Sequence, residues 1–275
     1  MPILVSSWLP CRWSSSAGLA RLAFLAIGLT AAVSLGAGRA TVVTTSELKV
    51  GARPLIVVDS DGGGVQLSAG AGGTVRVEAE RQADSEEQAR KLEVVTRLEG
   101  NTVHIEFKQA HHREHASVAF RITAPADARL RIGTGGGSVE ARGFSGGIEV
   151  ETGGGGVQVA DAQGSIKLRS GGGSIDVRHV SGTVEVETGG GSVNVDGALS
   201  GKNRVETGGG SIHVAIPGAS KLSVDASTGG GSANNEFGLG GERHPGHFRG
   251  TIGDGSGGSL ELRTGGGSIY LGKQG

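Results

Sequence analysis

Four side chains of the kinds that bind metal ions lie within five residues: His111, His112, Glu114 and His115. Imidazole and carboxylate groups bind Zn²⁺ or Ni²⁺, so this segment offers a metal-binding loop. The alternative is a solvated turn that joins a strand ending near Lys108 to one starting at Ser117. A later pair, His244 and His247, allows the same two interpretations. Both interpretations stay open for each segment. We favour the solvated turn, and we expect neither a bound metal nor a cofactor.

Glycine-rich turns also occur in calcium-binding repeats, where an aspartate stands at the sixth position of every nine-residue unit. Only "GGGSIDVRH" provides that aspartate, as Asp176. The equivalent positions of other units are Glu140, Gln158, Asn194 and His213. One aspartate cannot supply the six or more oxygen ligands of each Ca²⁺ in a stack. The pattern therefore speaks against a calcium-dependent fold.

These equivalent positions form a possible outward column of acids and amides: Glu140, Gln158, Asp176 and Asn194. Acids on one face could act on sugars as general acid and base. We find no matching cluster of lysines or arginines in the sequence and few aromatic residues to stack on sugars, so we expect no enzyme. A phosphate loop is excluded as well, because "GALSGKNR" (197–204) has the wrong spacing and no helix after it.

The elements that would carry this column are set by a repeat. A Thr or Ser followed by three glycines occurs seven times, and successive spacings are 18, 18, 18, 19, 21 and 36 residues. The motifs begin at Thr134, Thr152, Ser170, Thr188, Thr207, Thr228 and Thr264. A fixed period of this size indicates stacked repeat units.

Each unit contains two short alternating segments, and the aligned units give four columns of small aliphatic residues. A strand this short gains stability only by pairing with its counterpart one unit away. The pattern predicts an all-β chain, namely a single-stranded β-helix or β-solenoid with coils of about 18 residues and two short strands each, preceded by an irregular β section. Asn203 and Asn235 are the polar residues that interrupt the apolar columns.

The glycines are expected at corners that need a positive φ and allow backbones to approach closely. We therefore expect Gly190→Val to impair folding and Asn194→Ala, on the solvent side, to leave it intact. The Thr or Ser before each triplet is expected to form a column of hydroxyl groups.

Three regions are predicted. Residues 1–40 resemble a signal peptide, or an uncleaved N-terminal anchor, because arginines precede an uncharged apolar stretch and small residues follow it. Residues 41–130 form an irregular β section with strands near 47–50, 54–58, 65–68, 74–80, 92–98, 102–108 and 117–122, and a charged helix or loop at 81–91. Residues 131–275 form the glycine-rich repeat, with a loop insertion at 236–258 in the place of one missing coil. There Phe237 and Phe248 would shield apolar surface.

Charge and cysteine content narrow the classes of function. The chain has a formal net charge of −1, which becomes −4 without the leader, since that segment holds three arginines and no acid. Nothing here is basic enough to favour nucleic acid. The single cysteine, Cys11, lies in the leader, so cysteine catalysis and thiolate zinc sites are excluded for residues 41–275.

The segment "RITAP" (121–125) leads into "ARLRIGTGGGSVEARG" and then into the repeated units. This layout resembles the bacterial putative-adhesin family, exported β-strand-repeat proteins of unknown function, over residues 45–271. The resemblance implies a β-helix-like fold outside the cytoplasm, and it identifies no catalytic residues.

We therefore expect an exported structural or interaction protein of the periplasm, cell envelope or cell surface, without catalytic activity. Its partner would be a protein or a glycan, and it would touch a membrane only through an uncleaved leader. The alternative hypothesis is a carbohydrate-binding or carbohydrate-active β-helix protein. A third hypothesis is a metal-responsive envelope protein.

Overall fold

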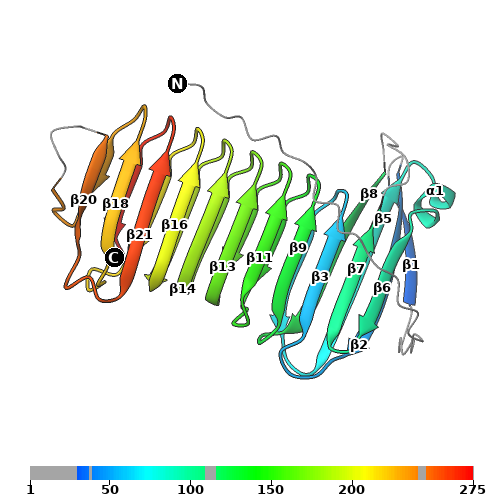
Figure 1. Cartoon of the computed structure of the whole chain (residues 1–275). Helices are drawn as coiled ribbons and strands as arrows, with labels where there is room; N and C mark the ends of the chain where they lie inside the picture. Colours follow the sequence, from blue (N-terminus) through cyan, green and yellow to red (C-terminus); the bar gives the residue numbers. More distant parts are fainter. Residues whose placement is uncertain (1–29, 37–38, 109–115, 241–245, 275) are drawn as a thin grey trace, which may run out of the picture.

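The chain is all-β, as the sequence predicts, with 62% of its residues in strands and 2% in helix. The computed structural model describes residues 30–36, 39–108, 116–240 and 246–274 (Figure 1). Its elements in chain order are β1 (Thr30–Gly36), β2 (Arg39–Lys49), β3 (Leu55–Ser60), β4 (Val65–Gly70), β5 (Thr74–Ala83), α1 (Glu86–Arg90), β6 (Val94–Glu99), β7 (Thr102–Phe107), β8 (Ser117–Pro125), β9 (Arg129–Thr134), β10 (Val139–Arg142), β11 (Ile148–Thr152), β12 (Val157–Ala160), β13 (Gln163–Ser170), β14 (Ile175–Thr188), β15 (Val193–Leu199), β16 (Gly201–Thr207), β17 (Ile212–Ile216), β18 (Ser223–Thr228), β19 (Ala233–Asn235), β20 (His247–Thr251), β21 (Gly258–Thr264) and β22 (Ile269–Lys273).

All these strands belong to one sheet, which folds into two opposed layers of strands. We call the outer surfaces of these layers, and the strands that form them, face A and face B. Face A, the labelled front row of Figure 1, runs in the order β6, β7, β3, β9, β11, β13, the second half of β14, β16, β21, β18 and β20. Face B runs in the order β1, β2, β5, β8, β4, β10, β12, the first half of β14, β15, β17, β22 and β19. Strand β14 passes from face B to face A and so joins the two.

The expected fold class, a single-stranded β-helix or β-solenoid built of successive coils, is wrong. The sheet is a nearly closed barrel of mixed parallel and antiparallel strands. The order of its strands departs from chain order, because β3 lies between β7 and β9, and β21 lies between β16 and β18. Antiparallel pairs occupy both ends, as in β1–β2–β5–β8 and β18–β20. Similar repeat units present equivalent hydrogen-bonding edges, so the period alone does not determine which units become neighbours.

The predicted pairing between units is confirmed for the regular part of the sheet. Strands β10, β12 and β14 pair in parallel and in register at a spacing of 18 residues, as in Val139↔Val157↔Ile175. Because the register is constant, like side chains lie above one another about 4.8 Å apart. The apolar columns thus merge into one continuous buried core, from Leu48 in β2 to Leu271 in β22.

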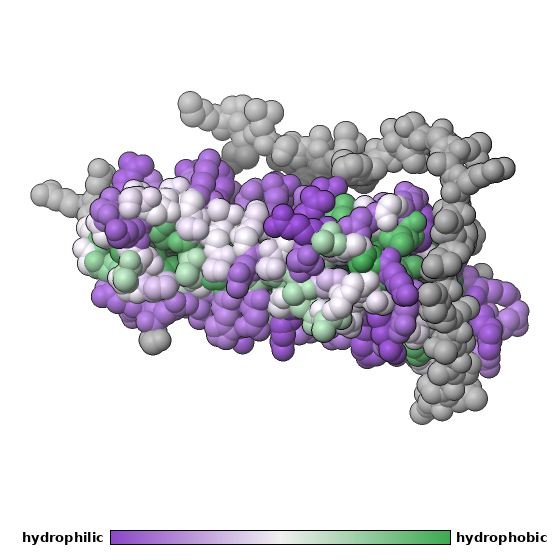
Figure 2. All heavy atoms as spheres, turned by 90° about the horizontal axis from the view of Figure 1, so that it is seen from below, coloured by the Kyte–Doolittle hydropathy of each residue, from purple (hydrophilic) through white to green (hydrophobic). Residues whose placement is uncertain are grey.

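The core accounts for nearly all the large apolar side chains. Among the described residues, only Val95 and Tyr270 are large hydrophobic residues with a high exposure, of 36% and 39%. Figure 2 shows the molecule from below. Hydrophilic side chains border both long edges of this view, and small apolar patches lie between them. A small second cluster of Val42, Ala83 and Ala89 lies where α1 packs on β2 and β5.

The irregular section contains the strands that the sequence predicts; β2, β3, β4, β5 and β8 are longer than expected, and β6 and β7 are one residue shorter. The predicted strand near 47–50 is the end of β2, and the charged segment 81–91 contains α1, which Ser85 caps. Most of the expected leader lies outside the described residues, but residues 30–36 form β1, which pairs with β2. No helix among the described residues is long and apolar enough to cross a membrane.

Of the two reasons expected for the triple glycines, the close approach of backbones is confirmed and the positive φ is wrong for this corner. In the corner at 189–191 no glycine has a positive φ, whereas the opposite corners contain such residues, for example Gly164 at φ 95°. A Cβ atom on Gly191 would lie 2.1 Å from the carbonyl oxygen of Gly173, one unit away, and Gly189 is equally crowded. A Cβ on Gly190 would meet nothing within 4 Å. The first and third glycines thus permit backbone contact, and the expectation for Gly190 is wrong.

The hydroxyl column before the triplets is confirmed, and its partners are backbone groups. The Ser170 hydroxyl accepts a hydrogen bond from Gly173 N at 2.9 Å and donates one to Gly155 O, in the preceding unit, at 3.0 Å. Thr264 donates to Gly210 O at 2.7 Å, and Thr228 donates to Gly267 O at 2.6 Å. Hydroxyls such as that of Ser170 therefore join two units, and the same contact persists where the units are out of chain order.

The segment 236–258 does not fill the place of a missing unit. Strands β21 and β22 pair directly with β16 and β17, while β18 and β19 lie one position further out. The described part of the segment contains β20, which pairs with β18 and buries Phe248, 2% exposed. Phe237 packs against the same core. The prediction that these two rings shield apolar surface is therefore confirmed.

Asn203 stands in an apolar column because it completes a ladder that an extra residue interrupts. Its Oδ1 accepts from Val184 N at 2.9 Å, and its Nδ2 donates to Ser259 O in β21 at 3.1 Å. The residue is 1% exposed, so these bonds satisfy backbone groups that water does not reach. Asn203 thereby links β14, β16 and the out-of-order β21.

We predict that Gly191→Ala lowers the free energy of unfolding by at least about 1–3 kcal/mol, because the methyl group meets a backbone carbonyl that cannot move aside. Gly190→Ala is the matched control and should change it by less than about 0.5 kcal/mol. Urea unfolding followed by circular dichroism measures both. Equal effects of the two substitutions would contradict this account of the corner.

We predict that Asn203→Leu destabilises the fold although it restores the apolar pattern, because it leaves Val184 N and Ser259 O without partners. The expected loss is about 1–3 kcal/mol in the same unfolding measurement. The exposed Asn194→Ala serves as the control and should be neutral. A more stable Asn203→Leu protein would show that the column tolerates leucine and that the bonds are dispensable.

Candidate functional site

Most outward charged side chains on face A form ion pairs with one another. Neighbouring strands there place opposite charges side by side, with Arg131 Nε 3.0 Å from Glu149 Oε2 and Lys167 Nζ 3.3 Å from Glu185 Oε2. Each exposed pair contributes only about 0–1 kcal/mol, but together the pairs neutralise the surface. Face A therefore offers few unpaired groups to a ligand.

Face B carries a row of outward polar side chains, one from each of eight neighbouring strands. This polar row consists of Gln66, Glu140, Gln158, Asp176, Asn194, His213, Tyr270 and Asn234. The sequence predicts its second to fifth members, Glu140, Gln158, Asp176 and Asn194, and their common outward face is confirmed. In the described part of the chain, the side chains of Gln158 and Asn194 have no hydrogen-bond partner, so they are available to a ligand.

A groove runs beside the polar row because the residues two positions before three of its members, immediately ahead of each strand, are small. Ser138, Gly156 and Ser174 line this hollow of about 400 Å³ together with Gln158 and Asp176. Residues i and i+2 of a strand share one face, so short side chains at 138, 156 and 174 leave the row standing as a wall. The groove is open and polar, which suits a ligand that lies along the surface.

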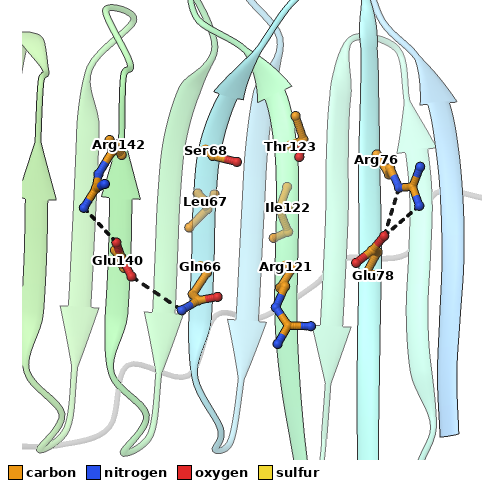
Figure 3. A pocket seen from close by; sticks show the side chains of 10 residues that line it. All are labelled: Gln66, Leu67, Ser68, Arg76, Glu78, Arg121, Ile122, Thr123, Glu140 and Arg142. Atoms are coloured by element: carbon orange, nitrogen blue, oxygen red, sulfur yellow. Dashed lines mark hydrogen bonds and ion pairs between the residues drawn. The ribbon is translucent and has the colours of Figure 1, made fainter.

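A second hollow of about 360 Å³ continues the groove across β5, β8, β4 and β10 (Figure 3). Its centre is formed by the short side chains of Ser68 and Thr123. Arg76 and Glu78 border one side, and Glu140 and Arg142 border the other. The Gln66 amide donates to Glu140 at 3.4 Å, and both residues line the two hollows, so the hollows form one groove.

Arginines accompany the acids of the groove, which corrects the expectation that the acidic column lacks them. Arg142 Nη2 lies 3.1 Å from Glu140 Oε1, and Arg178 Nη2 lies 2.5 Å from Asp176 Oδ2. The hydrogen bond to Asp176 raises the pKa of Arg178. Because the arginine stands two residues after the acid in each strand, the alternation of strand residues brings them together. The groove thus presents positively charged hydrogen-bond donors and negatively charged acceptors.

Two rings lie side by side near the far end of the polar row, one position before Asn234. The rings of His213 and Tyr270 lie 5.9 Å apart at 41°. The Tyr270 hydroxyl donates to Glu236, and Glu236 also accepts from the backbone N–H of Lys273 at 2.8 Å. These bonds lower the pKa of Glu236, and the bond to Glu236 raises the pKa of Tyr270. Glu236 therefore holds the tyrosine ring in place.

Of the other candidate sites of the sequence, only His247 and residues 197–204 fall within the described residues. The residues His111, His112, Glu114 and His115, and also His244, lie outside the described residues. His247 lies 3.3 Å from Asp225 on face A. Within the described ranges no group of three His, Cys, Asp or Glu residues could hold a metal ion. Residues 197–204 lie in β15 and β16, with no helix to bind a phosphate.

Sequence reasoning missed the arginines of the groove and the two rings near the far end of the polar row. Tyr270 occupies the position of Asn194 and His213 in the aligned units, since "GGGSIYL" matches "GGGSVNV" and "GGGSIHV". That alignment contained the signal. By contrast, the contribution of Arg76 and Glu78 depends on β5 pairing with β8, which no repeat motif indicates.

Comparison with known proteins gives neighbours of structure alone. No protein-family model matches the chain, and no curated protein matches it. A putative cell adhesion protein from Clostridium sporogenes aligns at 16% identity and a TM-score of 0.40, covering 84% of this chain and 99% of its own. A putative adhesin from Bacteroides fragilis aligns at 12% and 0.41, with coverage of 84% and 97%. A putative lipid binding protein from Parabacteroides distasonis aligns at 15% and 0.39, with coverage of 85% and 97%.

The Bacteroides fragilis neighbour is described by the name of the family that the repeat units resemble, and the Clostridium sporogenes one as a putative cell adhesion protein. At these identities and TM-scores, the likeness carries no argument about ligand, partner or activity.

Proposed function

We propose that this protein is an exported, non-catalytic interaction protein of the cell envelope or cell surface. In this adhesin-like role it binds a glycan along the groove of face B. The leader-like residues 1–40 support export, because a charged start, an apolar stretch and small residues are typical of secretory signals. The long regular sheet serves as the scaffold that presents the groove.

The observation that carries the proposal is the contrast between the two faces. On face A, opposite charges in neighbouring strands pair with each other, as in Lys167 and Glu185. On face B, the polar row presents the free amides of Gln158 and Asn194 beside a groove of small residues. Amides and carboxylates in a line are suited to bind successive hydroxyl groups, since each can accept or donate.

The surface favours a glycan over a protein as the ligand. Stable protein interfaces contain a desolvated core enriched in aromatic and other large apolar residues. Large exposed apolar residues are limited to Val95 and Tyr270 among the described residues. A sugar needs hydroxyl-binding groups and one apolar surface for its ring, and face B provides both.

The groove also bears on the alternative of a carbohydrate-active enzyme. Hydrolysis of a glycosidic bond requires one carboxyl group that donates a proton and a second that acts as base or nucleophile. Glu140 and Asp176 lie on strands two positions apart, with Gln158 between them. Each already binds an arginine, so either would have to break an ion pair in order to act. This arrangement supports binding without turnover.

We predict that the full chain binds one class of linear glycan on an array and releases no product from it. The double variant Gln158→Ala/Asn194→Ala should weaken this binding at least about tenfold, because it removes two ligand-facing amides at the centre of the groove. Biolayer interferometry with the bound glycan measures the affinity, and a reducing-end assay measures turnover.

The matched control is Lys167→Ala/Glu185→Ala, which removes an exposed ion pair from the same part of the sheet on face A. It should leave affinity unchanged. Equal losses in both double variants would contradict the assignment to face B. Product release that Glu140→Ala or Asp176→Ala abolishes would instead establish the enzyme.

A further inference from the structure

The two rings near the far end of the polar row suggest how the ligand is anchored. We propose that Tyr270 is a stacking subsite for a pyranose ring, at which a linear glycan lying along the polar row ends. This inference rests on the proposed function, and it adds a direction and a minimum length to the ligand.

The position of Tyr270 makes it part of the same track. The register runs from Asn194 to His213 to Tyr270 without a break. Tyr270 lies four strand positions from Gln158, or about 19 Å at the usual spacing between strands. A single sugar cannot touch both residues, so the ligand must be an oligosaccharide.

The ring is held ready for a ligand. Its hydroxyl donates to Glu236, which is itself fixed by the N–H of Lys273. Gly272 leaves room beside the ring, because a Cβ atom there would lie 3.0 Å from Tyr270 Cε1. Lys273 Nζ stands 5.4 Å from the centre of the Phe237 ring, which secures the segment on the other side. Little conformational freedom remains to be lost on binding.

The chemistry around the ring favours a sugar. Tyr270 is 39% exposed, and its neighbours along the polar row are His213 and Asn234. A pyranose presents C–H groups on one face and hydroxyl groups at its rim, so it can stack on the ring while the rim bonds to the polar neighbours. A solitary ring in polar surroundings is too small for the apolar core of a protein interface.

Tyr270 is the one tyrosine in the whole chain, which permits a direct test. The full chain labelled with 3-fluorotyrosine gives a single ¹⁹F resonance from this ring. Titration with glycan fragments of increasing length, taken from the array ligand, should leave that resonance in place for short fragments. It should shift once the fragment is long enough to span from Gln158 to Tyr270.

Substitutions supply the second measurement. Tyr270→Ala should weaken binding of the long fragments about tenfold and leave the short fragments unaffected, whereas Tyr270→Phe should stay within about threefold of the wild type. Val95→Ala, the change at the other exposed apolar residue, should have no effect. Thermal unfolding by circular dichroism checks that each variant is folded.

The outcomes separate the two proposals. Long fragments that bind through Gln158 and Asn194 without shifting the resonance, and with no loss in Tyr270→Ala, would overturn the stacking subsite and leave the proposed function standing. Absence of any glycan binding, or binding of a protein in its place, would overturn both.

Discussion

Close backbone contact at the Thr-Gly-Gly-Gly corners is the constraint on which the rest of the structure depends. The third glycine of each unit packs against a carbonyl of the neighbouring unit in the sheet, and a buried hydroxyl bonds to the third glycines of both units, as Ser170 does. These contacts leave no room for a slip of one residue. They hold every strand of the regular section in register, and constant register is what gathers the aliphatic residues into a single core.

The same register makes the outward side chains of the two faces different. On face A, alternation of acid and base from one unit to the next pairs the surface with itself, whereas on face B the polar row keeps amides free. Small residues at 138, 156 and 174 then deepen face B into a groove. The proposed binding surface is therefore built from many short strands in line, without a deep pocket.

The period in the sequence was enough to predict strand positions, the in-register pairing and the outward column from Glu140 to Asn194. It could not predict the closed, mixed sheet, because equivalent units leave their order open. What determines that order is specific to a few residues, such as Asn203, whose side chain bonds to Ser259 in the out-of-order β21. The arginines of the groove were missed for a related reason: Arg76 arrives through the antiparallel pair β5–β8, outside the repeat.

The central claim, that ligand lies along face B, is tested most directly by carboxyl footprinting of the wild-type chain. Carbodiimide labelling read by mass spectrometry compares Glu140 in the groove with Glu149 and Glu185 on face A. The side chain of Glu140 is 37% exposed, and those of Glu149 and Glu185 are each 48% exposed. Bound glycan should protect Glu140 and leave the two face A carboxylates as reactive as before. Protection of Glu149 or Glu185, with Glu140 unchanged, would contradict the account.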